Sequence, residues 1–133
     1  MSKFSWPVRV YYEDTDSGGV VYYANYLRFM ERARTEWLRA HGFEQTELAR
    51  EHGIIFVVRD VHISYLRPAV FNDLLQVTVD VHATGKSWIE FAQTVERGEI
   101  LSQAQVKIVC VNHPSFKPVV IPDIIRKKLD NQS

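Results

Sequence analysis

Residues 12 to 23 read YEDTDSGGVVYY and combine groups that acyl-transfer chemistry needs. Asp14 and Asp16 are carboxylates two positions apart, and Gly18 and Gly19 follow them. A carboxylate can act as a general base on water or attack a carbonyl carbon directly. Glycines allow a tight turn with positive φ and let a ligand approach the main chain. Asp16 is therefore one candidate for this chemistry on the turn.

A long amphipathic helix is predicted after the turn, from about Tyr22 to His41, and Gly42 is its stop signal. Capping preferences alone favour Asn25 as the N-cap. The N–H groups of a first helical turn have no partner within the helix and stabilise negative charge. The helix start therefore offers an oxyanion site beside the acidic turn. The apolar positions recur at spacings of three and four, at Tyr26, Phe29, Met30, Ala33, Trp37 and Leu38.

Alternation with a period of two predicts five strands. The first covers residues 8–13 and leads into the motif. The others cover residues 57–66, 75–82, 88–96 and 100–111, with turns at 84–87 and 97–99. A short helix is expected over residues 45–52. This order of elements indicates an α+β fold in which an antiparallel sheet wraps around one long central helix.

The run from Tyr12 to Tyr26, followed by one long helix and then strands, resembles the hotdog-fold acyl-CoA thioesterases of the 4-hydroxybenzoyl-CoA thioesterase family, in particular their YbgC branch. The motif DTDxxGVVY at residues 14–22 carries the resemblance. It implies a single hotdog domain over residues 1–133, hydrolysis of acyl-CoA to a free acid and coenzyme A, and no metal or organic cofactor. Many relatives have His at the position of Tyr23, so no imidazole role is carried over.

The resemblance also assigns the site, with Asp16 as the catalytic residue. It moves the first helical turn forward to Tyr22 and Tyr23, and the backbone amide of Tyr23 then polarises the thioester carbonyl. Two protomers join their sheets edge to edge, as a dimer or as a dimer of dimers (a homotetramer), with the site between subunits. Substrate contacts are expected at Gly19, Val20 and Tyr23, at Val57, Val58 and Arg59 of the partner subunit, and at Lys86 and Ser87 near the nucleotide end of coenzyme A.

Alternative interpretations stay open. The pattern alone favours an N-cap or Asx-turn role for Asp16, and at Lys86 an ordinary exposed turn is as well supported as a phosphate contact. Asp14 is interpreted as structural. A non-catalytic scaffold or acyl-thioester-binding protein linked to the Tol-Pal system is one alternative function. A hotdog dehydratase acting on carrier-bound acyl groups is another, although that chemistry favours a histidine and the motif contains none.

The composition and residue patterns limit the kinds of partner and the cellular location that are expected. The chain has 16 basic and 16 acidic residues, so a nucleic-acid partner is not expected. No apolar run approaches the roughly 20 residues of a membrane span, and the N-terminus lacks the apolar core of a signal peptide. The histidines show no metal-ligand spacing. The single cysteine, Cys110, lies in an apolar strand pattern, which predicts a buried inert thiol and a cytoplasmic protein.

The C-terminal segment, residues 114–133, contains three prolines and then a short basic helix predicted over residues 124–129. It either docks on the domain or stays solvated. A sharper hypothesis is that this basic end contacts acidic lipid or an acidic acyl carrier protein. The protein would then sit at the periphery of the inner membrane, with the carrier protein as a second partner beside acyl-CoA.

Overall fold

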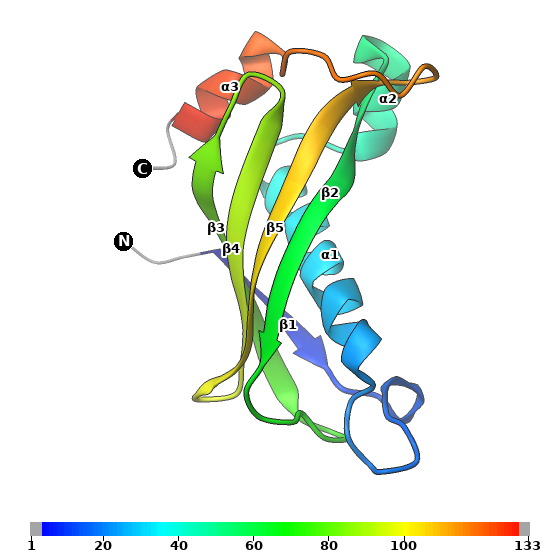
Figure 1. The fold of residues 1–133 in the computed structure, drawn as a ribbon, viewed down its shortest axis with the longest axis vertical. Helices are drawn as coiled ribbons and strands as arrows, with labels where there is room; N and C mark the ends of the chain where they lie inside the picture. The colour runs from blue at the N-terminus through cyan, green and yellow to red at the C-terminus, as the bar shows by residue number, and fades with distance from the viewer. Residues whose placement is uncertain (1–3, 131–133) are drawn as a thin grey trace.

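The computed structural model describes residues 4–130 as a five-stranded antiparallel sheet with one long helix and two short ones (Figure 1). The strand order is β1-β3-β4-β5-β2, so β1 and β2 form the two edges. The predicted α+β hotdog arrangement is confirmed. The elements are β1 (Phe4–Arg9), a 3-10 turn (Tyr12–Asp14), α1 (Tyr23–Ala40), α2 (Gln45–His52), β2 (Ile54–Tyr65), β3 (Leu74–Thr84), β4 (Trp88–Glu96), β5 (Ile100–Asn112) and α3 (Asp123–Asp130).

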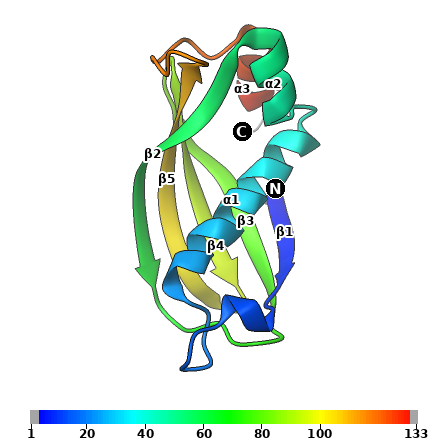
Figure 2. The ribbon, with the colours of Figure 1, turned by 90° about the vertical axis from the view of Figure 1, so that its right-hand side faces the viewer.

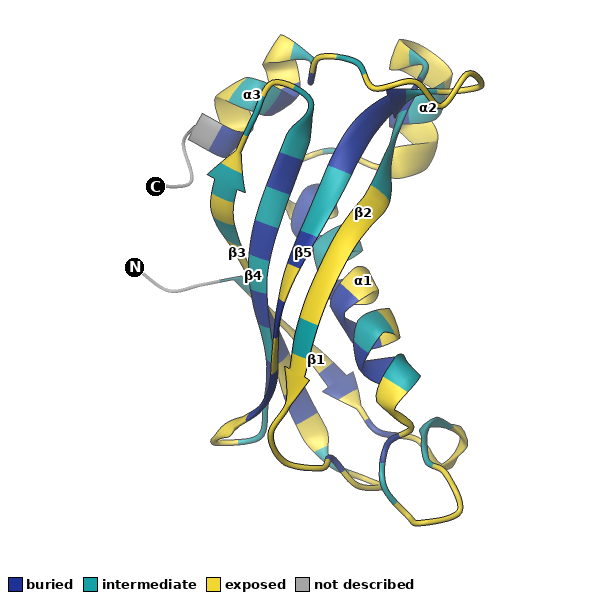
Figure 3. Ribbon diagram, in the orientation of Figure 1, coloured by how far each residue is buried: buried dark blue, intermediate teal, exposed yellow. Residues whose placement is uncertain are grey.

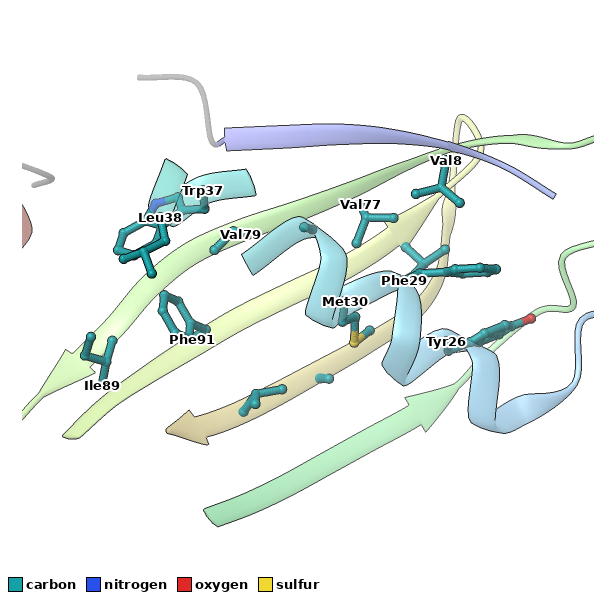
Figure 4. Packing of buried hydrophobic residues seen from close by; sticks show 14 of the residues in the cluster. Val8, Tyr26, Phe29, Met30, Trp37, Leu38, Val77, Val79, Ile89 and Phe91 are labelled. Atoms are coloured by element: carbon teal, nitrogen blue, oxygen red, sulfur yellow. The ribbon is translucent and has the colours of Figure 1, made fainter. Parts of the chain in front are cut away.

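Helix α1 lies across one face of the curved sheet (Figure 2). Its predicted apolar stripe is buried along its whole length, and Phe29, Met30 and Ala33 are completely inaccessible. Figure 4 shows this stripe packed toward β3 and β4, where Val77 and Phe91 are also buried. Burying a large apolar side chain contributes about 1.5–3 kcal/mol. The stripe therefore fixes the position of α1 on the sheet.

Gly42 ends α1 as predicted. It adopts a left-handed conformation with φ of 90°, its N–H donates to the carbonyl of Arg39, and the N–H of Phe43 donates to the carbonyl of Leu38. These two bonds form a Schellman motif, which satisfies carbonyls that the helix leaves free. The next helix, α2, has the predicted bounds.

The predicted first strand is wrong in its second half. β1 ends at Arg9, and residues 12–14 form a 3-10 turn instead of continuing as a strand. The cause is local, because the carboxylate of Asp14 accepts the N–H of Tyr11 at 2.8 Å and the N–H of Asp14 donates back to the carbonyl of Tyr11 at 3.0 Å. Asp14 and Asp16 therefore do not share one face of an extended segment.

The segment after β5 docks on the domain. The N–H of Val119 donates to the carbonyl of Cys110, and the N–H of Ile121 donates to the carbonyl of Lys86. Ile121 and Ile125 are each 1% exposed, so both complete the core. The predicted short helix is present as α3, and the docked alternative is the correct one. Residues 131–133 of the predicted tail lie outside the described residues.

Cys110 is fully buried under this segment. Desolvation raises the pKa of its thiol to about 11, because burial disfavours the charged thiolate. The predicted burial of the thiol is confirmed. Across residues 4–130, none of the helices has the length and apolar character that a membrane crossing requires.

Replacing Ile125 with Ala should lower the free energy of unfolding by about 2–5 kcal/mol, the usual cost of a large-to-small change in a core. Denaturant unfolding followed by circular dichroism measures this. Ile124→Ala is the matched control, because Ile124 is the preceding residue of α3 but is 48% exposed. Equal losses in the two variants would contradict the docking of α3.

Candidate active site

The acidic turn is held in shape by its own main chain. The N–H of Gly19 donates to the carbonyl of Asp16 at 3.0 Å, and the N–H of Asp16 donates to the carbonyl of Val20 at 2.9 Å. Gly19 has a φ of 81°, a conformation that residues with a Cβ rarely adopt. At Gly18 a Cβ would lie 3.2 Å from Oδ1 of Asp16. Gly19 is therefore needed for the backbone conformation of the turn. Gly18 has a steric task, because it leaves space beside the carboxylate of Asp16.

The carboxylate of Asp16 is exposed. Its Oδ1 accepts the N–H of Gly18 at 2.8 Å, which is an Asx turn as the pattern alone suggested. No described residue donates a hydrogen bond to Oδ2. The Asx turn thus orients the carboxylate and leaves one oxygen open to a ligand.

Helix α1 begins at Tyr23, with Tyr22 as an N-cap that makes no side-chain capping bond. The start implied by the family resemblance is confirmed, and the N-cap predicted at Asn25 from capping preferences is wrong. The N–H of Tyr22 donates to the carbonyl of Asp14 at 2.9 Å. The N–H of Tyr23 has no acceptor among residues 4–130, so it is available to an oxygen of a ligand.

Asn25 has a different task in the first turn of α1. Its side-chain amide donates to the carbonyl of Asp14 at 3.0 Å, and the residue is buried. The same carbonyl also accepts the N–H of Tyr22. Two donors on one helix end therefore hold the acidic segment, and this contact sets the position of Asp16 relative to the free amide of Tyr23.

A tyrosine cluster forms the wall next to the helix start. The hydroxyl of Tyr65 donates to the carbonyl of Tyr23 at 3.1 Å, and the hydroxyl of Tyr26 accepts the N–H of Ala69 at 3.0 Å. Together they line a pocket of about 270 Å³ with Val21, Leu66, Arg67 and Pro68. Burial raises the pKa of the Tyr65 phenol, so this hydroxyl stays protonated near neutral pH and does not serve as a base.

The other predicted site residues lie elsewhere. Val57 and Val58 line a second pocket, of about 280 Å³, between α1 and the sheet. Arg59 is exposed at an irregularity of β2, with its Nε 3.7 Å from the carboxylate of Asp60. Lys86 and Ser87 form the turn between β3 and β4, and the side chain of Lys86 is exposed.

The predicted site residues lie at two opposite ends of the protomer. Figures 1 and 2 both show the loop before α1 at the lower end and the β3–β4 turn at the upper end, beside α3. Asp16, Gly19, Val20 and Tyr23 lie on one loop and the helix start that follows it, whereas Lys86 and Ser87 lie at the other end of the protomer. Within the described part of the chain, no three His, Cys, Asp or Glu side chains gather as metal ligands.

Sequence reasoning missed two residues, Gln93 in the interior and Tyr65 beside the helix start. Gln93 is 1% exposed and accepts a hydrogen bond from Nη1 of Arg34 at 2.9 Å. A signal was present, because Gln93 occupies the inward position between Phe91 and Val95 in an otherwise apolar alternation. Tyr65 was also missed as a site residue. Its hydrogen bond to the helix start joins residues 42 positions apart in the chain, so no local pattern signals it.

Comparison with known proteins places the chain in a family. The Thioesterase-like superfamily matches residues 10–129. The chain belongs to this family. It is 48% identical over 124 residues to the acyl-CoA thioesterase YbgC of Haemophilus influenzae, covering 92% of this chain and 91% of that protein. It is 44% identical to the acyl-CoA thioester hydrolase YbgC of Escherichia coli, covering 92% of each.

A solved structure agrees with these matches. The crystal structure of a probable thioesterase from Bartonella henselae superimposes with a TM-score of 0.87 at 37% identity. The superposition covers 91% of this chain and all of that one. The predicted relationship to the thioesterases is therefore confirmed, and the acidic turn and helix start lie inside the matched region.

Gly18→Ala should lower the kcat of thioester hydrolysis, because the new Cβ pushes against Oδ1 of Asp16. Gly19→Ala should instead lower the free energy of unfolding by about 1–2 kcal/mol, the cost of a left-handed residue that carries a Cβ. Steady-state kinetics and denaturant unfolding on both variants measure the two effects. A stability loss in Gly18→Ala without any change of kcat would refute the steric task of Gly18.

Proposed function

We propose that this protein hydrolyses acyl-CoA thioesters to a free acid and coenzyme A. The observation that carries the proposal is the presence of two groups with no hydrogen-bond partner among residues 4–130, both in the segment that leads into α1. One is Oδ2 of Asp16, and the other is the N–H of Tyr23. A thioesterase needs such a pair, because one group delivers the attacking oxygen and the other receives the developing negative charge.

The chemistry follows from the two groups. The thioester carbonyl oxygen accepts the N–H of Tyr23, and the partial positive charge of the helix start stabilises the oxyanion as it forms. The carboxylate of Asp16 removes a proton from the attacking water, or attacks the carbonyl carbon itself and gives a mixed anhydride that water then hydrolyses. Either route expels coenzyme A as its thiolate, which takes up a proton.

We further propose that the complete site forms between two protomers. Strand β2 is an edge of the sheet, and most of its residues from Val58 to Tyr65 are exposed (Figure 3). Val58 and Tyr65 on it are 49% and 43% exposed. An open edge of this length invites pairing with another strand. Antiparallel pairing about a two-fold axis sets the lower end of one protomer beside the upper end of its partner.

This arrangement would join the two groups of site residues that one protomer keeps apart. The pocket at Tyr23 would continue into the pocket at Val57 and Val58 of the other subunit. Gly19, Val20 and Arg59 would border this channel, and Lys86 and Ser87 would meet the nucleotide end of coenzyme A. On the family resemblance, we also propose a dimer of dimers and a link to the Tol-Pal system. The single cysteine supports a cytoplasmic location, and the basic C-terminal end supports a place near the inner membrane and acyl carrier protein as a second thioester donor.

Asp16→Asn should keep the fold and lower the kcat of acyl-CoA hydrolysis by at least about a hundredfold, the low end for loss of a general base. Release of free coenzyme A thiol measures turnover across a panel of acyl-CoAs. Glu13→Gln is the control, because Glu13 is an exposed carboxylate of the same turn. Near-normal turnover in Asp16→Asn would remove this residue from catalysis. Binding of acyl-CoA without any hydrolysis by the wild type would favour the scaffold alternative.

The paired substitution Val58→Lys and Val61→Lys should convert the protein to monomers of 15.5 kDa and abolish turnover. Lysines on an open edge oppose strand pairing. Sedimentation velocity measures the mass, and Gln105→Lys on the inner strand β5 is the control. Full activity in a monomeric variant would contradict a shared site.

A further inference from the structure

Eight of the twelve residues that line the pocket between α1 and the sheet are apolar, and its two charged side chains are Arg34 and Glu31. Arg34 reaches into it from α1, where Trp37 and Phe91 form part of the wall. Gln45 closes the upper side, and its Oε1 accepts the N–H of Phe56 at 3.2 Å. The pocket measures about 280 Å³. A charged group in such a wall needs a reason, because burying a charge is unfavourable unless it is paired.

Arg34 is held in place by a buried amide. Its Nη1 donates to Oε1 of Gln93 at 2.9 Å. The amide nitrogen of Gln93 donates to the carbonyls of Met30 at 3.1 Å and Thr78 at 3.3 Å, so its orientation is fixed from both sides. A guanidinium carries five N–H donors. The described residues accept one hydrogen bond from Arg34, so its other donors are available to a ligand in the pocket that Arg34 lines.

The charge of Arg34 is not neutralised by an ion pair with any described residue. Desolvation lowers its pKa to about 10, and the negative charge of Glu31 on the same helix raises it in part. No carboxylate of residues 4–130 lies within ion-pair distance of its guanidinium. Arg34 is therefore still a cation near neutral pH, and its free donors face a space large enough for part of an acyl group.

We propose that Arg34 determines specificity by selecting acyl groups that carry a neutral hydrogen-bond acceptor, such as a carbonyl oxygen, near their far end. The inference rests on the proposed function and on the shared site. Tyr23 and Arg34 are eleven residues apart on α1, about 16 Å along its axis. In the shared site proposed above, Arg34 instead serves the thioester held at the partner's helix start. Glu31 lines the same pocket and disfavours a terminal carboxylate.

The test measures hydrolysis of matched pairs of acyl-CoAs with acyl chains of six, eight and ten carbons. One member of each pair carries the plain acyl chain, and the other carries a carbonyl at the penultimate carbon of that chain. The wild type should prefer the oxo member of at least one pair by about tenfold or more in kcat/KM, the effect of one hydrogen bond to a charged group. Arg34→Met should lose this preference, mainly through KM, and keep hydrolysis of the plain acyl group.

Arg28→Met is the matched control, because Arg28 is an exposed arginine of the same helix that makes no contact with the pocket. If Arg34→Met fails to fold because Gln93 loses its donor, Arg34→Met combined with Gln93→Leu removes both partners and carries the same expectation. The inference is overturned if no pair shows a preference, if Arg34→Met lowers both members equally, or if adipoyl-CoA is preferred to every oxo substrate. Absence of any hydrolysis would instead refute the proposed function.

Discussion

Phe29, Met30 and Ala33 have no accessible surface, and their contact with the sheet determines where α1 lies. Because this packing prevents α1 from sliding along the sheet, the first turn of the helix has one fixed position. There the carbonyl of Asp14 accepts the N–H of Tyr22 and the side-chain amide of Asn25. The apolar interior thus positions the polar site, because the acidic turn is fastened to a helix end that packing has already fixed.

The amphipathic helix, the alternating strands and the α+β fold were predictable because each depends on periodic burial. The acidic turn was predictable for a different reason, since Asp16 and Gly19 have strong local preferences. The 3-10 turn at Tyr12–Asp14 was not, because it arises from a side-chain bond between Asp14 and Tyr11 that competes with strand pairing. The helix start was also missed by capping preferences alone, since the Asn25 side chain bonds to a distant carbonyl instead of to its own helix.

Arg34 and Gln93 show where sequence reasoning reaches its limit. Helical spacing assigns Arg34 to the polar positions, yet the curved sheet reaches far enough round α1 to half-bury it. Gln93 breaks an apolar alternation, but its partners lie on α1 and β3, far away in the chain. A buried polar pair of this kind is recognised only when the elements that enclose it have been placed.

Cys110 has a practical consequence. It is the single cysteine of the chain, it is covered by the C-terminal segment, and its thiol has a pKa of about 11. Thiol-directed reagents act on the thiolate, so the native protein offers them almost no target at neutral pH. A cysteine introduced at an exposed position would therefore take up a fluorophore or spin label at one defined place, with the native residue left untouched.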